Sequence, residues 1–243
     1  MVVEGKRKSI EMLKERARLV GYVPPSLKYH PELKRDLTEL LLDPEKTALL
    51  VIDVQNAFTD PKAKLAAPDG PTIVPNINKL VKYCREHKIP IIWVQETNRK
   101  DGSDIGIMAK YWPFLGPPET YLAEGSWAWE LYPKLDFKPE DIYIKKPKYI
   151  AFWGSDLEAV LRSLGVEHLI FTGICTDICV GTTMIYAMHL DYNCVMVKDA
   201  TTTFTKYKEA FLDNAELLWC RVLTTDEVLA ELEALRPKAG GAK

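Results

Sequence analysis

The sequence contains little of what several kinds of functional site require. It has four histidines among 243 residues, and no two of them have the spacing of a metal-binding pair. No apolar run approaches the roughly 18 residues that a membrane-spanning helix needs. The formal net charge is −2, without the surplus of Lys and Arg that nucleic-acid-binding proteins carry. We therefore expect no metal, no other cofactor, and no nucleic-acid or membrane partner.

Cysteine is also scarce. The five cysteines are an odd number scattered along the chain, which is not typical of a disulfide framework. Cys175 and Cys179 are four positions apart, unlike the C-x-x-C spacing of redox and zinc motifs. The first 20 residues are too charged for a secretory signal. These features predict a reducing, cytoplasmic setting.

Short apolar segments alternate with helical patterns from residue 47 onward. The expected strands are residues 47–55, 90–95, 141–146, 168–174, 193–199 and 219–224. The expected helices are residues 71–88, 155–165, 178–191, 206–218 and 224–235. Such alternation favours right-handed crossovers and a parallel sheet covered on both faces. The predicted fold is a doubly wound α/β domain with a six-stranded, mostly parallel sheet and helices on both faces.

The pattern also suggests boundaries. Residues 1–45 are expected to form an N-terminal helical arm, packed either on the rest of the chain or on a neighbouring subunit, and residues 46–236 a single domain. Residues 97–139 interrupt the alternation and are rich in Trp, Tyr, Pro and Gly, which predicts a lid or specificity segment. Two of the expected helices begin with the spacing of a capping box, at Ser155–Glu158 and at Thr224–Glu227.

Reactive side chains follow three of the expected strands. Asp53 ends the first, Lys145, Lys146 and Lys148 end the third, and Cys179 opens the helix after the fourth. The carboxyl ends of parallel strands share one edge of a sheet, where ligands bind. A thiol at a helix N-terminus is also biased toward thiolate. Each residue has a simpler explanation, as a turn cap, a solvated lysine or a small buried hydrophobe. Together they favour a Cys/Asp/Lys site.

Three segments carry a resemblance to a known family. TALLVIDVQNAF, KKPKYIAFWGSDL and LIFTGICTDICVGTTMIYA resemble, in order and spacing, the signature segments of the isochorismatase-like cysteine hydrolases. That family includes nicotinamidases, N-carbamoylsarcosine amidase and ureidoacrylate amidohydrolases, and the resemblance covers roughly residues 45–225. It implies a catalytic triad of Asp53, Lys146 and Cys179, with Lys146 rather than Lys145 or Lys148 as the lysine.

The resemblance implies a mechanism as well. It places a cis peptide between Ile174 and Cys175, and an oxyanion hole formed by the backbone N–H groups of Cys175 and Cys179. Cys179 would attack an amide-type carbonyl and form a thioester, while Asp53 would move the proton.

Two features restrict the reaction. Residues 56–70 contain no histidine, whereas metal-holding members such as nicotinamidases carry histidines in that loop. Isochorismatases proper lack the cysteine, so Cys179 indicates C–N cleavage. We predict a metal-independent amidohydrolase acting on a small ureido, carbamoyl or carboxamide compound. A nicotinamidase-type or isochorismatase-type hydrolase, a non-catalytic binding protein and a redox protein using Cys175 and Cys179 remain as alternatives.

Substrate contacts are expected around the triad. Alignment with the ureidoacrylate and carbamoyl-amide branch suggests Phe58, Gln95, Glu96, Trp112 and Tyr149. Two positions depart from that branch, because Ile150 replaces a serine and Glu96 is acidic where an asparagine is familiar. A carboxylate at Glu96 disfavours an anionic ligand and favours a neutral or cationic ureido compound. The resemblance also implies a homodimer or homotetramer.

Overall fold

A parallel sheet forms the centre of the molecule. The computed structural model describes residues 2–25 and 35–237. The strands are β1 (Thr47–Ile52), β2 (Ile91–Glu96), β3 (Ile142–Lys146), β4 (His168–Ile174), β5 (Asn193–Thr202) and β6 (Arg221–Leu223). They form one six-stranded sheet in the order β3-β2-β1-β4-β5-β6, and every pair is parallel. The predicted doubly wound α/β fold is confirmed.

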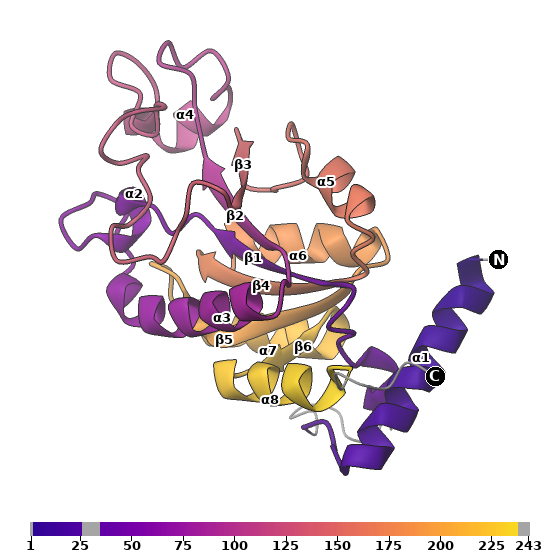
Figure 1. Ribbon diagram of the computed structural model, residues 1–243. Coiled ribbons are helices and arrows are strands. Elements are labelled where there is room, and N and C mark those ends of the chain that lie inside the picture. Colours follow the sequence, from indigo (N-terminus) through magenta and orange to yellow (C-terminus); the bar gives the residue numbers. More distant parts are fainter. Residues whose placement is uncertain (1, 26–34, 238–243) are drawn as a thin grey trace.

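Helices cover both faces of this sheet (Figure 1). On one face lie α3 (Val74–Glu86) and α8 (Thr225–Leu235), and on the other lie α5 (Leu157–Ser163), α6 (Cys179–His189) and α7 (Lys208–Leu218). The side chains of β1 alternate between the two cores, with Leu49 and Val51 on the α3 side and Leu50 and Ile52 on the α6 side. Among the described helices, none combines the length and apolar character needed to cross a membrane.

The chain order identifies where a ligand would bind. β2 and β3 extend the sheet from β1 in one direction, whereas β5 and β6 extend it from β4 in the other. The order therefore reverses between β1 and β4, and a crevice opens beyond the carboxyl ends of strands at such a switch point. Asp53 follows β1, and Cys179 is the first residue of the helix after β4.

One of the two predicted capping boxes is present. At α8, the Thr224 hydroxyl accepts from the Glu227 amide, and the Glu227 carboxylate accepts from the Thr224 amide. At α5 the prediction was wrong, because the N-cap is Asp156 and its side chain makes no capping hydrogen bond. The Ser155 hydroxyl instead donates to the Ala151 carbonyl, which fixes the turn before the helix.

The N-terminal arm packs on its own chain. Helix α1 (Val2–Val20) contacts α8, and the buried side chains of Leu13, Ala17, Leu41 and Leu235 form a small separate core there. Just after α1, the Tyr22 hydroxyl donates to the Glu231 carboxylate at 2.8 Å. These contacts join the arm to the same chain. Residues 26–34 of the predicted arm, including His30, lie outside the described residues.

Replacing Tyr22 with phenylalanine is expected to lower the free energy of unfolding by about 1–2 kcal/mol. The Glu231 carboxylate is fully buried and also accepts from both terminal nitrogens of Arg221 and from the Leu42 amide, so the Tyr22 hydroxyl belongs to a closed polar network. Urea denaturation measures the change. The control is Tyr111→Phe, at a side chain that is 78% exposed. Equal stability of the two variants would contradict the packing of the arm.

The insertion of residues 97–139 covers the carboxyl ends of β1, β2 and β3 (Figure 1). It contains helix α4 (Met108–Tyr111) and a 3₁₀ turn at Pro113–Leu115. Backbone hydrogen bonds join it to the loop after β1, where Asn56 donates to the Glu130 carbonyl and Tyr132 donates to the Val54 carbonyl. That loop includes the short helix α2 (Asn56–Thr59), so the insertion and α2 form one layer over the sheet edge.

Candidate active site

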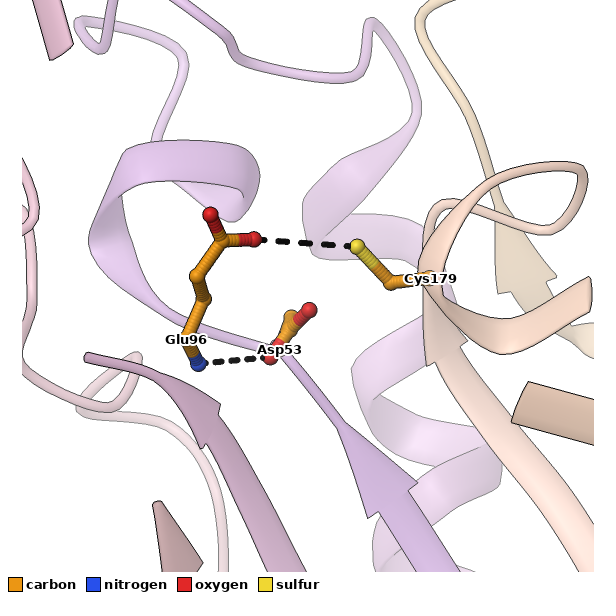
Figure 2. A group of neighbouring side chains, drawn as sticks. All are labelled: Asp53, Glu96 and Cys179. Atoms are coloured by element: carbon orange, nitrogen blue, oxygen red, sulfur yellow. Dashed lines mark hydrogen bonds between the residues drawn. The ribbon is translucent and has the colours of Figure 1, made fainter. Parts of the chain in front are cut away.

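The strand ends bring Asp53, Lys146 and Cys179 into one buried cluster. Asp53 and Lys146 are 0% exposed and Cys179 is 5% exposed. The Lys146 Nζ lies 2.7 Å from Asp53 Oδ2. The Cys179 Sγ and carboxylate oxygens of Asp53 and Glu96 all lie within 4.8 Å of one another. Figure 2 shows these three side chains pointing toward one another. The structure thus brings the three predicted catalytic side chains together.

Only one lysine of the 145–148 segment enters this cluster. Lys145 is largely exposed and pairs with Glu124 on the insertion at 2.6 Å. Lys148 donates to the backbone carbonyl of Ile105, also on the insertion. Lys146 points inward, because it is the last residue of β3 and alternates with Lys145. The buried position agrees with the choice of Lys146 that the resemblance implied.

Backbone geometry holds Asp53 in place. Its φ of 53° lies in the left-handed region, which aspartate tolerates better than most residues. Its amide donates to the Val94 carbonyl, and its carboxylate Oδ1 accepts from the Glu96 amide at 2.8 Å. Beside it, Gly173 has a φ of 116°, and a Cβ there would lie 1.9 Å from the Ile52 carbonyl oxygen. Glycine at 173 therefore lets β4 approach the end of β1.

The turn between β4 and α6 presents two amides beside the thiol. The cis peptide between Ile174 and Cys175 that the resemblance implied is present. The Cys175 carbonyl accepts from the amides of Ile178 and Val180, which closes the turn. Cys179 begins α6, and the first amides of a helix have no intrahelical partner. Within the described residues, neither the Cys175 nor the Cys179 amide donates to a backbone carbonyl, so both are available to a ligand.

Glu96 is a second carboxylate in the cluster. Its Oε2 atom lies 3.5 Å from Lys146 Nζ and 3.9 Å from Cys179 Sγ, the latter contact being drawn in Figure 2. The sequence predicted a substrate contact at Glu96 but not its contact with the thiol and the lysine. That contact follows from the register of β2 and β3, which pairs Glu96 with Lys146. In the sequence, the available sign of this role was an acidic residue directly after the strand expected at residues 90–95.

Burial controls the protonation of these groups. It raises the pKa of Cys179 well above the usual value, although the nearby Lys146 ammonium opposes the shift. Burial therefore opposes the bias toward thiolate that the helix N-terminus and Lys146 supply. Burial also raises the pKa of Asp53, and it raises the pKa of Glu96 to about 6, while the Lys146 ammonium opposes both shifts. Burial alone would lower the pKa of Lys146, but Asp53, Cys179 and Glu96 raise it above its usual value.

The cluster also contains side chains of the types that bind metal ions. Asp53, Glu96 and Cys179 are close enough to offer one ligand atom each. However, the Lys146 ammonium contacts both carboxylates, at 2.7 and 3.5 Å, and supplies the positive charge there. A divalent ion would lie next to this buried cation, and the repulsion is strong in a dry interior. Asp53, Glu96 and Cys179 are therefore a poor ligand set for a divalent metal ion, and the mechanism proposed for the protein involves no metal.

A narrow cavity reaches the thiol. It is lined by Phe58, Leu65, Glu96, Trp112, Leu115, Leu122, Tyr149, Cys175, Ile178, Cys179 and Phe204. About 30 Å³ of it can hold the centre of a water molecule. Four of the five expected substrate contacts line it. Gln95 does not, because its side chain donates to the Trp129 carbonyl at 2.6 Å. Trp112, Leu115 and Leu122 come from the insertion, which thereby forms one wall.

The chain matches a known protein family in sequence, and known structures of that family in fold. Residues 47–227 match the isochorismatase domain model. A cysteine hydrolase from Pseudomonas syringae pv. phaseolicola 1448A is similar, with 26% identity over 80% of this chain and 96% of that one, and a TM-score of 0.76. An isochorismatase family protein from Burkholderia thailandensis has 29% identity over 79% and 98%, with a TM-score of 0.68.

An amidase shares the fold at lower identity. N-carbamoylsarcosine amidase from Thermoplasma acidophilum has 22% identity over 74% of this chain and 97% of that one, with a TM-score of 0.63. The family model covers most of the chain and includes Asp53, Lys146 and Cys179. The chain therefore belongs to the isochorismatase family, and its architecture is similar to that of a cysteine hydrolase of known structure.

Proposed function

We propose that the protein is a metal-independent cysteine amidohydrolase that cleaves a C–N bond of a small ureido, carbamoyl or carboxamide compound. The observation that carries the proposal is a thiol, a carboxylate and an ammonium buried together at the end of a narrow cavity. The narrow cavity, with an empty volume of about 390 Å³, favours a small substrate.

The first half of the reaction forms a thioester. As the Cys179 sulfur attacks the carbonyl carbon, the thiol proton moves to Asp53 and the carbonyl electron pair moves to oxygen. The amides of Cys175 and Cys179 stabilise this oxyanion, at roughly 3 kcal/mol per donor in comparable sites. The C–N bond then breaks, and Asp53 returns the proton to the departing nitrogen. Because burial raises the pKa of both Cys179 and Asp53, the proton can pass between them without a charged thiolate in the free protein.

The second half hydrolyses the thioester. Asp53 removes a proton from water, whose oxygen attacks the thioester carbonyl, and the C–S bond breaks. The proton then returns to Cys179, so that one amide and one water give one acid and one amine. Lys146 keeps its positive charge throughout, and its 2.7 Å contact holds the Asp53 carboxylate beside the thiol.

An ammonia-release screen tests the proposal. The compounds are carboxamides, ureas, ureido acids and biuret-type compounds, each supplied to the purified protein. With a slowly hydrolysed hit, mass spectrometry is expected to find the acyl group on the peptide that contains Cys179. The peptides that contain Cys84 and Cys194, two other buried thiols, serve as internal controls. Turnover with the acyl group on a different residue, or with no acyl-enzyme under rapid quenching, would contradict the proposal.

A further inference from the structure

The cavity has a single charged side chain in its wall. Among the described residues that line it, Glu96 is charged, and the others are apolar, aromatic or thiol-bearing. None of these lining residues is Lys, Arg or His. A carboxylate group on a ligand would therefore meet no cation in the wall, but it would meet Glu96. A cationic group would find its counter-ion there.

The surrounding charges do not neutralise Glu96 completely. The Lys146 Nζ atom lies 2.7 Å from Asp53 Oδ2 and 3.5 Å from Glu96 Oε2. One ammonium group is therefore shared between two buried carboxylates. Lys148, the next cation along the chain, donates instead to the Ile105 carbonyl. With both carboxylates ionised and Cys179 neutral, the cluster carries one excess negative charge. A positive ligand group would offset this charge, and a negative one would add to it.

Half of the Glu96 carboxylate is unused. Its Oε2 atom makes both contacts, with Lys146 and with Cys179. Within the described residues, no hydrogen bond reaches Oε1, and Figure 2 shows this second oxygen turned away from Cys179. The side chain is 3% exposed and lines the cavity, and Oε1 is not among the fully buried polar atoms that lack a partner. A ligand in the cavity can therefore donate to Oε1 while Oε2 keeps its contacts with Lys146 and Cys179.

The aromatic walls favour the same kind of ligand. Phe58, Trp112, Tyr149 and Phe204 line the cavity, and the rings of Trp112 and Phe204 meet edge to face at 6.2 Å. The face of an aromatic ring carries partial negative charge and attracts ammonium and guanidinium groups.

We propose that Glu96 determines substrate specificity by binding a cationic or N–H-rich group of the substrate through Oε1, beside the carbonyl that Cys179 attacks. The substrate class, which rests on the proposed amidohydrolase function, is then a small ureido or amide compound that carries an amine, amidine or guanidine group. Compounds with a carboxylate in that place are excluded. The competing explanation is that Glu96 only balances the charge of Lys146, in which case its removal changes the turnover of all substrates by the same factor.

Three ureas of similar size separate these explanations. They are 2-aminoethylurea, propylurea and N-carbamoylglycine, which end in an ammonium, a methyl and a carboxylate. Their kcat/KM values are compared in the parent protein and in Glu96→Gln, which keeps the shape and removes the charge. We expect the ratio of the ammonium to the carboxylate compound to fall by about 100-fold in this variant. The matched control is Glu124→Gln, which removes an exposed carboxylate outside the cavity and should leave the ratio unchanged.

A pH series gives a second measurement that needs no variant. Asp53, Lys146, Cys179, Lys148 and Tyr149 surround Glu96. Burial raises its pKa to about 6, with Asp53 adding to the rise and Lys146 and Lys148 opposing it. Glu96 is charged above that pH and neutral below it, while the ammonium of 2-aminoethylurea stays protonated. The ratio of the ammonium compound to propylurea in the parent protein should fall by about tenfold between pH 7.5 and pH 5.

Each outcome decides one question. A ratio that is unchanged by Glu96→Gln overturns the role of Glu96 and leaves the amidohydrolase function standing. Failure of the parent protein to release ammonia from any compound of the ammonia-release screen, together with an unmodified Cys179, overturns the proposed function itself. A fall in the ratio in Glu96→Gln but not in Glu124→Gln supports both.

Discussion

Replacing Cys179 with alanine is expected to reduce amide hydrolysis by at least about 10⁴-fold, to the level that binding and the oxyanion donors supply alone. The reason is that no other nucleophile in the cavity wall can take its place. Cys175 also lines the cavity, but of these two thiols only that of Cys179 lies within 4.8 Å of carboxylate oxygens of both Asp53 and Glu96. Ammonia release at saturating substrate measures the loss.

The control for this variant is Cys220→Ala. Cys220 lies outside the cavity and is half-buried, so its removal tests whether the loss of any thiol lowers activity. The Cys179→Ala protein should keep the thermal stability of the parent to within about 1–2 kcal/mol, because a buried neutral thiol behaves as a small hydrophobe. More than a tenth of the parent activity in a folded Cys179→Ala protein would show that hydrolysis does not pass through a thioester at this residue.

Much of the fold follows from local sequence pattern. The alternation of apolar segments and helices predicted the parallel sheet, because crossovers between parallel strands have one hand and place helices on the faces. Strand ends also predicted that Asp53, Lys146 and Cys179 lie at one edge, since that edge is common to all parallel strands. The same reasoning was insufficient at α5, where the Ser155 hydroxyl donates to the Ala151 carbonyl and accepts from the Leu157 amide, and these local bonds replace the expected capping box.

The environment of the site was less predictable. The contact between Glu96 and Lys146 depends on which strands are neighbours and on their register, and neither is encoded within one segment. Gln95 and Glu96 are adjacent in sequence but lie on opposite sides of β2, so only one of them enters the cavity. The protonation of Cys179 depends on the depth of burial, which the helix N-terminus alone does not reveal.

Replacing Lys146 with methionine is expected to destabilise the fold and to reduce turnover by about 10³-fold. Methionine fills a similar volume but leaves Asp53 and Glu96 buried without a cation. Breaking a buried ion pair in this way costs about 3–5 kcal/mol of unfolding free energy. The control is Lys145→Met, since the pair of Lys145 with Glu124 is largely exposed and contributes about 1 kcal/mol at most. Urea denaturation of both variants at pH 7 measures the difference.

The stability of Lys146→Met should also depend on pH in a defined direction. Without the ammonium, both carboxylates have folded-state pKa values above those of the unfolded chain, so the folded protein binds more protons than the unfolded one. The stability of the variant relative to the parent should therefore recover as pH falls from 7 to 5. A deficit that is constant over this range would show that the loss comes from packing and not from charge.

A second substitution separates stability from catalysis at this position. In the double variant Lys146→Met with Glu96→Gln, only the Asp53 carboxylate remains in the cluster, and the repulsion between two buried carboxylates is gone. Part of the lost stability, about 1–3 kcal/mol, should return. Turnover should not return, because Asp53 still lacks the ammonium that holds it beside Cys179. Recovery of activity together with stability would mean that Lys146 serves the fold alone, and that Asp53 and Cys179 suffice for the chemistry.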